Sequence, residues 1–232
     1  KLLMHTEPDS VYANVAFYAL PNEIKRYKLN LTDHTFWIGS GCIDYSFEFR
    51  PRGGLISNEK RGVPEDHIFV APFYPIMNHV GFMGFPEATS GKVIILSGGS
   101  YYKIFDKTDT FFKLSKAILE ACPNSIILFA GAGDQIQMTK KLTEYGLTDK
   151  FLLIGHRKDI TEIFENADIY LNTFPFGGGL MTQYAAQKGI PVISYCTSNT
   201  SKAEEFVCQK NWIKLSYDSI EQVVEKVKRW VE

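Results

Sequence analysis

From residue 91 to the end of the sequence, short apolar runs alternate with stretches whose apolar residues recur every three or four positions. The runs are continuous and lack the polar alternation of a sheet with one face in water. Such continuous runs are typical of parallel strands that are covered on both faces. They predict five strands, with WIKLS (212–216) as a sixth: VIILSGG (93–99), SIILFAGAG (125–133), FLLIGH (151–156), IYLNTF (169–174) and VISYC (192–196).

The stretches between these runs predict helices. In residues 109–123, Phe112, Ile118 and Ala121 share one helical face, and Pro123 ends the segment. Further helices are predicted in the stretch that ends at Gly146, in ITEIFENA (160–167), in LMTQYAAQKG (180–189) and in SIEQVVEKVKRWVE (219–232). Strands that alternate with helices indicate an α/β fold with a doubly wound parallel sheet.

Residues 1–90 follow a different pattern. They hold seven of the ten prolines and only short strand-like pieces, TFWIG (35–39) and IDYSFEF (43–49). The polar segment RPRGGLISNEKRG (50–62) reads as an exposed loop. We therefore expect 1–90 to be the end of an incomplete amino-terminal lobe and 91–232 to be a carboxyl-terminal domain, with a hinge at EATSG (87–91). The sequence opens without an initiator Met, so we expect it to be part of a longer protein.

Composition and charge remove several classes of function. The formal net charge is −1, with no basic excess to hold a nucleic-acid backbone. The apolar runs all fall short of the roughly 20 residues of a membrane span. The four cysteines, Cys42, Cys122, Cys196 and Cys208, have no metal-ligand spacing. We expect Cys122 and Cys196 to be small core residues and the chain to be cytoplasmic, with no bound metal or cofactor.

Glycines follow four of the predicted strands, as SGG (97–99), GAG (131–133), GH (155–156) and GGG (177–179). Open parallel sheets bind ligands outside the carboxyl ends of their strands, where all four groups are predicted to lie. Glycines are also needed wherever a strand turns into a helix, so tight turning is the other interpretation of this pattern. The sequence therefore predicts the edge at which a ligand would bind, if one binds.

The segment TFPFGGGLMTQ (173–183) combines such glycines with a predicted helix start. The first turn of a helix presents unpaired N–H groups and a positive dipole end, which together attract anions. We expect Gly178 and Gly179 to make room for an anionic ligand on the backbone amides of Leu180 to Thr182, with the Thr182 hydroxyl as an added donor. The alternative is a glycine-rich turn without a ligand.

A lysine near the end of the first predicted strand fits the same interpretation. Lys103, in SGGSYYKI, is placed to reach over the sheet edge toward a phosphate, although an ordinary solvated lysine is the alternative. Other nucleotide motifs fail: there is no G-x-x-x-x-G-K-[ST], and GAGDQI lacks the third glycine of a dinucleotide fingerprint.

Four segments taken together resemble a known family: IGSGCIDYSFEF (38–49), SGGSYYKIFDK (97–107), PNSIILF (123–129) and GHRKDITEIFENADIYLNTFPFGGGLMTQYAAQKGIPVISY (155–195). They are similar, over residues 20 to 200, to the O-linked N-acetylglucosamine transferases and the bacterial cytoplasmic N-glycosyltransferases. The resemblance implies the two-lobed GT-B fold with a Rossmann-like carboxyl-terminal lobe. It also implies transfer of a sugar from a UDP-sugar to a protein or glycan acceptor, with inversion and without a metal.

The resemblance also implies roles for individual residues. Lys103 matches the family lysine that contacts the donor diphosphate, and it is the catalytic candidate. The rest of the implied donor site comes from the strand ends and the glycine-rich turn. It comprises Gly99, Ser100, Gly155, His156, Arg157, Phe176, Gly178, Gly179, Leu180, Met181, Thr182 and Tyr184.

This sequence departs from the family pattern at several of these positions. Tyr184 stands where the family usually has an acid for the ribose hydroxyls, and Leu180 and Met181 replace threonines. Ser100 replaces a glutamine of the O-linked enzymes. The departures motivate a second reading, a catalytically inactive binding or regulatory module of the same fold. A third is a UDP-sugar epimerase or hydrolase, for which the nearby carboxylates are Asp106, Asp109 and Asp134.

Overall fold

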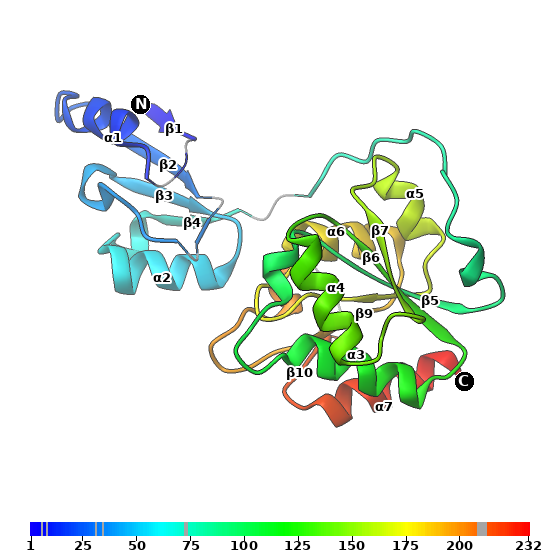
Figure 1. Ribbon diagram of the computed structural model, residues 1–232. Coiled ribbons are helices and arrows are strands. Elements are labelled where there is room, and N and C mark those ends of the chain that lie inside the picture. The colour runs from blue at the N-terminus through cyan, green and yellow to red at the C-terminus, as the bar shows by residue number, and fades with distance from the viewer. Residues whose placement is uncertain (6, 8, 31, 34, 72–73, 208–212) are drawn as a thin grey trace. The chain divides into compact units, whose positions relative to one another are not determined.

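The computed structural model describes residues 1–232 except 6, 8, 31, 34, 72–73 and 208–212 (Figure 1). It forms two compact units, Lys1–Phe73 (unit 1) and Tyr74–Glu232 (unit 2). The division falls before the expected boundary at residue 90. Residues 74–90 belong to unit 2 because backbone N–H groups of this segment, from Val80 and Met83, donate to carboxylates near α5 (Ile160–Glu165). The expected hinge at 87–91 also lies in unit 2, where η3 spans Glu87–Thr89.

Unit 2 holds a six-stranded parallel sheet in the order β10-β9-β8-β5-β6-β7. The chain moves outward from β5 to β6 and β7, returns to pair β8 with β5, and then moves outward in the opposite direction. The sheet therefore has a reversal point between β5 and β8. The strands are β5 (Val93–Gly98), β6 (Ser125–Ala130), β7 (Phe151–Gly155), β8 (Ile169–Leu171), β9 (Val192–Tyr195) and β10 (Ser216–Tyr217).

Helices cover both faces of this sheet. The side chains of Ile95, Ile127 and Phe129 pack with one set of helices, and those of Leu96 and Leu128 pack with the other. In Figure 1, α3 and α7 lie below the sheet and α5 and α6 above it. The first set is α3 (Thr110–Ala121), α4 (Gln135–Glu144) and α7 (Ile220–Val231), and the second is α5 and α6 (Gly179–Lys188).

This arrangement confirms the predicted doubly wound parallel sheet. Each of the five apolar runs forms a strand, and the stretches between them form the expected helices. The sixth strand is displaced. It was predicted at 212–216, where residue 212 lies outside the described residues, and it forms at Ser216–Tyr217. The candidate core cysteines Cys122 and Cys196 are buried and unpaired, whereas Cys208 lies outside the described residues.

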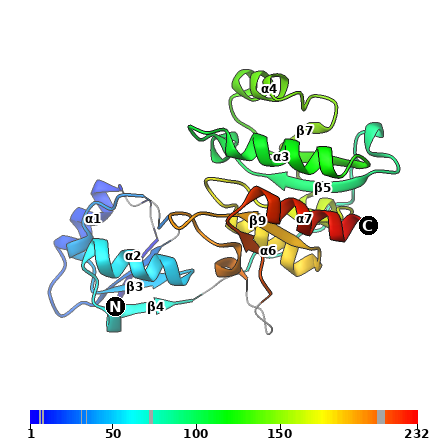
Figure 2. The same ribbon diagram turned by 90° about the horizontal axis from the view of Figure 1, so that it is seen from below.

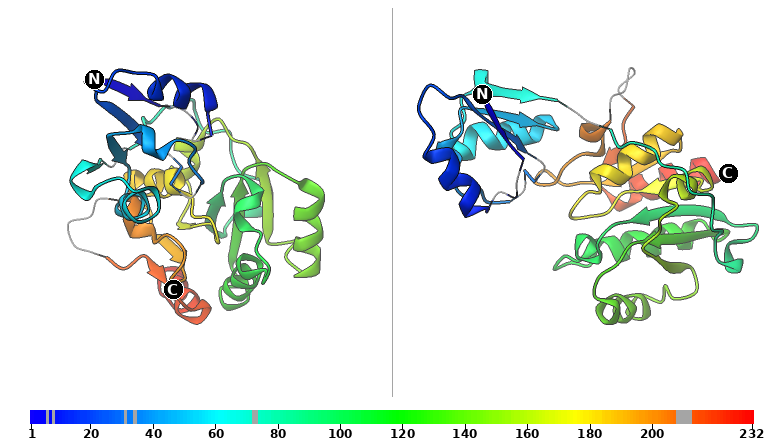
Figure 3. Two further views of the ribbon diagram at one scale, coloured as in Figure 1. Left: turned by 90° about the vertical axis from the view of Figure 1, so that its left-hand side faces the viewer. Right: turned by 90° about the horizontal axis from the view of Figure 1, so that it is seen from above.

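Unit 1 is a second parallel sheet, with strand order β1-β2-β3-β4. Each connection moves the chain one strand further in the same direction. Because crossovers between parallel strands are right-handed, they all lie on one face. Figures 2 and 3 show α1 and α2 on the same side of this sheet. The elements are β1 (Leu2–Met4), α1 (Val11–Tyr18), β2 (Arg26–Asn30), β3 (Tyr45–Glu48), α2 (Pro51–Arg61) and β4 (Ile68–Val70).

Two expectations for this region are wrong. The segment 50–62, read as an exposed loop, forms α2. Its buried face consists of Gly53, Gly54 and Ser57, which carry no apolar stripe for a sequence pattern to detect. The segment 35–39, read as strand-like, forms a bend and a turn. The strand expected within 43–49 is confirmed as β3.

The two faces of the unit 1 sheet have opposite chemistry. Beneath the helices lies a buried polar cluster in which Glu48 accepts hydrogen bonds from Ser46 and Ser57, both 2.6 Å long. In the same cluster, Arg50 donates through Nη2 to Asp33 Oδ1 over 2.7 Å. The opposite face carries stacked aromatic rings, with centroids 4.9 to 6.0 Å apart, from Tyr27, Tyr45, Phe47 and Phe69. Within the described ranges, no helix is both long and apolar enough to cross a membrane.

Candidate functional site

A cavity of about 630 Å³ opens at the carboxyl edge of the unit 2 sheet. It lies at the reversal point, because the loops after β5 and β8 both contribute to it, together with those after β6 and β7. Nine of the predicted site residues line it. The full lining is Gly99, Ser100, Lys103, Ala130, Gly131, Ala132, His156, Arg157, Lys158, Ile160, Gly178, Leu180, Met181 and Tyr184.

The floor of the cavity is main chain in close contact. A methyl group added at Gly131 would lie 1.9 Å from the carbonyl oxygen of Gly99, and one added at Gly98 would lie 2.4 Å from that of Ala130. The glycines after β5 and β6 therefore allow two backbones to touch. Glycine is favoured at position 155 for a different reason, because φ is +69° at this turn after β7. Gly155 does not line the cavity.

Asn172 holds the turn between β8 and α6. This buried side chain accepts hydrogen bonds through Oδ1 from the backbone N–H groups of Gly178 (2.8 Å) and Thr173 (3.0 Å). Thr173 in turn donates its hydroxyl to the carbonyl oxygen of Phe176 over 2.6 Å. Sequence reasoning missed Asn172. Its position as the one amide in the run IYLNTF was the available signal.

The three glycines of this turn face the protein's own side chains. A methyl group at Gly179 would lie 2.7 Å from the Phe206 ring, and one at Gly178 would lie 2.9 Å from the Tyr170 hydroxyl. A methyl group at Gly177 would lie 3.2 Å from Asn172 Nδ2. The absent Cβ atoms of Gly178 and Gly179 therefore make room for the protein's own side chains, whereas Gly178 still lines the cavity and Gly179 does not.

The start of α6 nevertheless presents free amides. The Thr182 N–H donates to the Gly178 carbonyl oxygen over 2.9 Å, which closes the first helical turn. Within the described residues, the N–H groups of Gly179, Leu180 and Met181 have no acceptor, and no side chain caps Gly178. The available amides are thus Gly179 to Met181, one residue earlier than the predicted set from Leu180 to Thr182.

Two predicted site residues support the turn from outside the cavity. The Thr182 side chain is fully buried, and its hydroxyl donates to the Gly178 carbonyl oxygen over 2.9 Å, so the structure does not place it among the lining groups. Phe176 donates its backbone N–H to the Lys103 carbonyl oxygen over 3.2 Å. This bond ties the turn to η4 (Tyr101–Ile104), the short helix that carries Lys103.

Lys103 supplies a positive charge at the same cavity. Its side chain is partly buried and passes over Gly99, where an added methyl group would lie 3.3 Å from Lys103 Cδ. Burial lowers the pKa of the Lys103 ammonium below its usual value because the charged form is desolvated. Among the described residues that line the cavity none is acidic, and none forms an ion pair with Lys103.

Arg157 lines the cavity, and its guanidinium donates hydrogen bonds to groups outside the cavity lining. It donates to Asp159 through Nε (2.7 Å) and Nη2 (2.6 Å), and to the Gly84 carbonyl oxygen (2.9 Å). The fully buried Asp159 also accepts from the Met83 N–H over 2.8 Å. The hydrogen bonds from Arg157 are the main reason that the pKa of Asp159 falls to about 2. Asp159, which sequence reasoning missed, thus fixes both Arg157 and the segment around Met83.

The remaining wall carries His156, Lys158 and Tyr184. His156 and Lys158 are exposed at the mouth, on the loop after β7. Lys158 is a second cation that sequence reasoning did not select. Tyr184 lines the cavity from α6, and its ring stacks on the fully buried Phe164 with centroids 5.9 Å apart and planes 23° apart. The wall therefore combines cations with one aromatic ring.

The carboxylates considered for an epimerase or hydrolase lie outside this cavity. Asp106 accepts hydrogen bonds from Thr108 and Thr110 at the start of α3. Asp109 pairs with Lys141 over 2.6 Å, and Asp134 accepts from the Gln137 N–H of α4 over 2.9 Å. All three acids stabilise helix starts or helix contacts. The alternative of an epimerase or hydrolase therefore loses the three carboxylates on which it rested.

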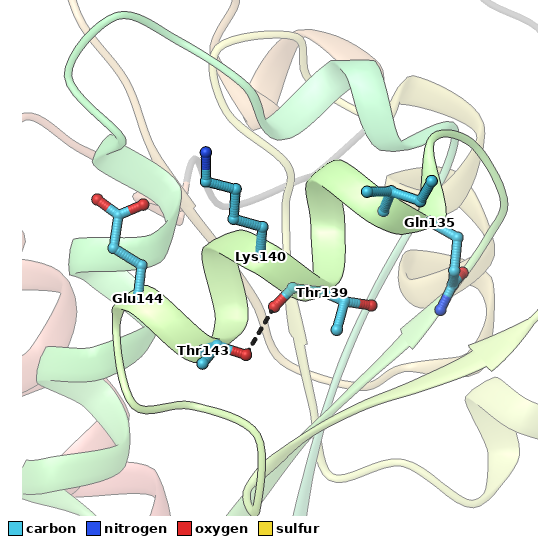
Figure 4. A pocket seen from close by; sticks show the side chains of 6 residues that line it. Gln135, Thr139, Lys140, Thr143 and Glu144 are labelled. Atoms are coloured by element: carbon cyan, nitrogen blue, oxygen red, sulfur yellow. Dashed lines mark hydrogen bonds between the residues drawn. The ribbon is translucent and has the colours of Figure 1, made fainter.

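A second hollow, of about 710 Å³, runs along the exposed face of α4 (Figure 4). Its lining comes from a single helix, and the one hydrogen bond drawn there joins the Thr143 hydroxyl to the Thr139 carbonyl oxygen. No groups from different elements converge on it. The lining residues are Gln135, Ile136, Thr139, Lys140, Thr143 and Glu144.

No protein-family model and no curated protein matches the sequence, but solved structures match the fold. HepE from Anabaena in complex with UDP-glucose matches with a TM-score of 0.65 and 13% identity, over 96% of this chain and 66% of that chain. A TarM mutant from S. aureus in a complex that includes UDP matches with a TM-score of 0.62 and 15% identity, over 89% and 44%. The pneumococcal O-GlcNAc transferase GtfA in complex with UDP and GlcNAc matches with a TM-score of 0.53 and 13% identity, also over 89% and 44%.

These matches show that the chain has the fold of the GT-B glycosyltransferases. The chain spans between 44% and 66% of the length of these three structures. The expected fold class is thereby confirmed. The narrower resemblance to O-linked N-acetylglucosamine transferases stays a prediction, as do the roles of the individual site residues.

Proposed function

We propose that unit 2 binds the diphosphate of a UDP-sugar at the start of α6, and that it is the donor-binding part of a glycosyltransferase. One observation carries the proposal. The unpaired amides of Leu180 and Met181 belong to residues that line a single cavity with Lys103, and this cavity has no acidic residue in its described lining. Both features favour an anion in the same place.

The physical basis is electrostatic. Free N–H groups at a helix start carry the positive end of the helix dipole, which stabilises phosphate groups. A partly buried ammonium adds a point charge that is weakly screened. The cavity volume of about 630 Å³ lies in the range of ligand pockets, roughly 300 to 1,000 Å³. A nucleoside diphosphate fits this combination of size and charge.

The same groups suit sugar transfer. As the bond from the anomeric carbon to the diphosphate oxygen breaks, negative charge grows on the departing UDP, and the α6 amides with Lys103 would stabilise it. An acceptor nucleophile would attack from the opposite side and invert the anomeric centre. We propose a protein or glycan acceptor, and transfer without a metal because these groups supply the positive charge. UDP affinity that is unchanged in EDTA would support the last point.

Calorimetric titration of UDP into the purified chain tests the proposal. We expect saturable binding that Lys103→Ala weakens at least tenfold, which corresponds to about 1.4 kcal/mol. Lys107→Ala is the matched control, because Lys107 is an exposed lysine four residues away that does not line the cavity. Absence of UDP binding, or equal losses from the two variants, would contradict the proposal.

A binding module without transfer is the second candidate, favoured by the absence of an acidic residue from the described lining. It shares the diphosphate contacts, so calorimetry does not separate it from a transferase. Incubation with a UDP-sugar and candidate acceptors does: transfer releases UDP only when acceptor is present. Release from donor alone would indicate a hydrolase instead.

A further inference from the structure

Tyr184 forms a fixed aromatic wall behind the diphosphate position. It lies five residues after Gly179 on α6, which is about 7.5 Å along the helix axis at about 1.5 Å per residue. One side of its ring stacks on the fully buried Phe164, so the ring cannot withdraw into the core. Tyr184 also lines the cavity. When a diphosphate binds at the start of α6, the chemical group attached to it on this side therefore contacts the Tyr184 ring.

In a nucleoside diphosphate, the group attached to the diphosphate is the pentose. Proteins commonly recognise the ribose 2′-hydroxyl with an Asp or Glu, because one carboxylate accepts hydrogen bonds from two neighbouring hydroxyls. A phenol has a single oxygen and cannot make the same pair of contacts. The contact that suits the ring face of Tyr184 turned away from Phe164 is stacking against the carbon face of the pentose.

No carboxylate in the described residues stands ready to replace that contact. The lining contains none, and the acids nearest to it in sequence are engaged elsewhere. Asp159 is buried against Arg157, and Glu162 of α5 accepts a hydrogen bond from the Val80 N–H over 3.0 Å. Besides Tyr184, the polar side chains of the lining are Ser100, Lys103, His156, Arg157 and Lys158, of which the two lysines and Arg157 can only donate.

We infer that the cavity binds nucleoside diphosphates without distinguishing ribose from 2′-deoxyribose, with Tyr184 contacting the pentose through its ring. The inference rests on the proposed function and specifies its donor class: the site takes ribonucleotide and deoxyribonucleotide sugars alike. A carboxylate on this wall would select the ribonucleotide. The ring does not, because the face of the pentose is nearly the same in both.

Paired titrations with UDP and 2′-deoxy-UDP test this. We expect dissociation constants within threefold of each other, and the same ratio for ADP and 2′-deoxy-ADP, because the base plays no part in the argument. A preference of tenfold or more for the ribonucleotide would overturn the inference while leaving the proposed function in place. If none of the four nucleotides binds, the proposed function fails and the inference fails with it.

Variants of Tyr184 identify the contact. Tyr184→Phe keeps the ring and its stack on Phe164, so we expect both affinities to stay within twofold of the parent chain. Tyr184→Ala removes the ring, and we expect both affinities to fall about equally, by fivefold or more. If Tyr184→Phe weakens UDP alone, the hydroxyl reads the 2′-position and the inference is wrong. Thermal unfolding of each variant establishes that a loss of affinity is not a loss of folding.

Discussion

The starts of α2 in unit 1 and α6 in unit 2 are locally alike and differ in what occupies them. Each helix follows a parallel strand and has a proline and consecutive glycines near its start. In RPRGG (50–54) these residues form the first turn of α2, and in FPFGGG (174–179) they precede α6, which begins at Gly179. At α2 the protein supplies its own anions: a methyl group at Gly53 would lie 2.7 Å from Glu48 Oε2 and 3.3 Å from Asp33 Oδ2. At α6 the first-turn amides stand at an open cavity beside Lys103.

The comparison shows that a glycine-rich turn before a helix does not by itself identify a ligand site. Gly53 makes room for carboxylates in unit 1, and the three glycines before and at the start of α6 make room for Asn172, Tyr170 and Phe206 in unit 2. The distinguishing feature is the charge that faces the helix start, which is negative at α2 and positive at α6. At α6 that charge comes from Lys103, far away in the sequence.

Removing the internal anion of unit 1 should have the largest effect. Asp33→Ala takes the bidentate carboxylate from the buried Arg50 guanidinium, and breaking such a pair costs about 3–5 kcal/mol. Hydrogen exchange measured by mass spectrometry should show loss of protection in unit 1 and not in unit 2. Asp66→Ala, at an exposed acid of unit 1, is the control and should change little. Unchanged protection in Asp33→Ala would show that the cluster does not stabilise unit 1.

Filling a glycine of the α6 turn should have the next largest effect. In Gly179→Ala the new methyl group meets the Phe206 ring at 2.7 Å, and overpacking of this kind costs about 1–3 kcal/mol. Thermal unfolding of unit 2 should shift downward by several degrees. Gly41→Ala, where no atom lies within 4 Å of the added methyl group, is the matched control. Equal stability of the two variants would show that the turn accommodates the added methyl group without loss of stability.

The charge that faces α6 should make nucleotide binding depend on pH. The pKa of Lys103 is lowered from 10.5 by burial, so its proton is lost below pH 10.5 as the pH rises. A bound diphosphate favours the protonated form, and UDP affinity should therefore decline through this range. In Lys103→Arg the guanidinium stays charged.

The affinity of the parent chain relative to Lys103→Arg, measured by calorimetry from pH 7 to 10, should fall as the pH rises. Using the ratio removes the titration of UDP itself. A ratio that does not change with pH would show that the Lys103 ammonium does not interact with the bound diphosphate. Without ligand, pH acts on stability in the opposite direction. The free energy of unfolding rises as the pH passes the lowered pKa of Lys103, because only the unfolded chain then keeps the proton on this lysine.

The smallest effect is expected at Thr182. Thr182→Val removes a buried hydroxyl that bonds Gly178, which should cost about 1 kcal/mol of stability. UDP affinity should stay within twofold, since the side chain does not line the cavity. Thr139→Val, on the exposed face of α4, controls for the substitution itself. A tenfold loss of affinity in Thr182→Val would restore the hydroxyl as a direct ligand contact.

The sequence was most informative where apolar periodicity determines structure. The strands of unit 2 and helices such as α3 follow from it, because their buried faces are apolar. The helix α2 was not detected because Gly53, Gly54 and Ser57 form its buried face, and Gly53 and Ser57 pack on polar side chains. Periodicity carries no signal for that kind of packing.

The candidate site divides in the same way. Lys103 and the glycines were accessible because they lie at strand ends, where ligands gather in parallel sheets. Asn172 and Asp159 were not, because their importance comes from partners that only the fold brings near, such as the Gly178 amide and the Arg157 guanidinium. Reasoning along the chain thus identified nine lining residues, but it missed the exposed Lys158 and the buried Asn172 and Asp159, which hold the site in place.

The interlocked backbones of Gly99 and Gly131 have a consequence for engineering. A surface built from main chain has no rotamers, so it cannot be reshaped by substitution without separating two strands of the sheet. New ligand preferences would have to be sought in the walls, and a combinatorial library directed at His156, Lys158 and Tyr184 would sample the adaptable part of the cavity. Libraries that include the glycines would mostly return chains that fail to fold.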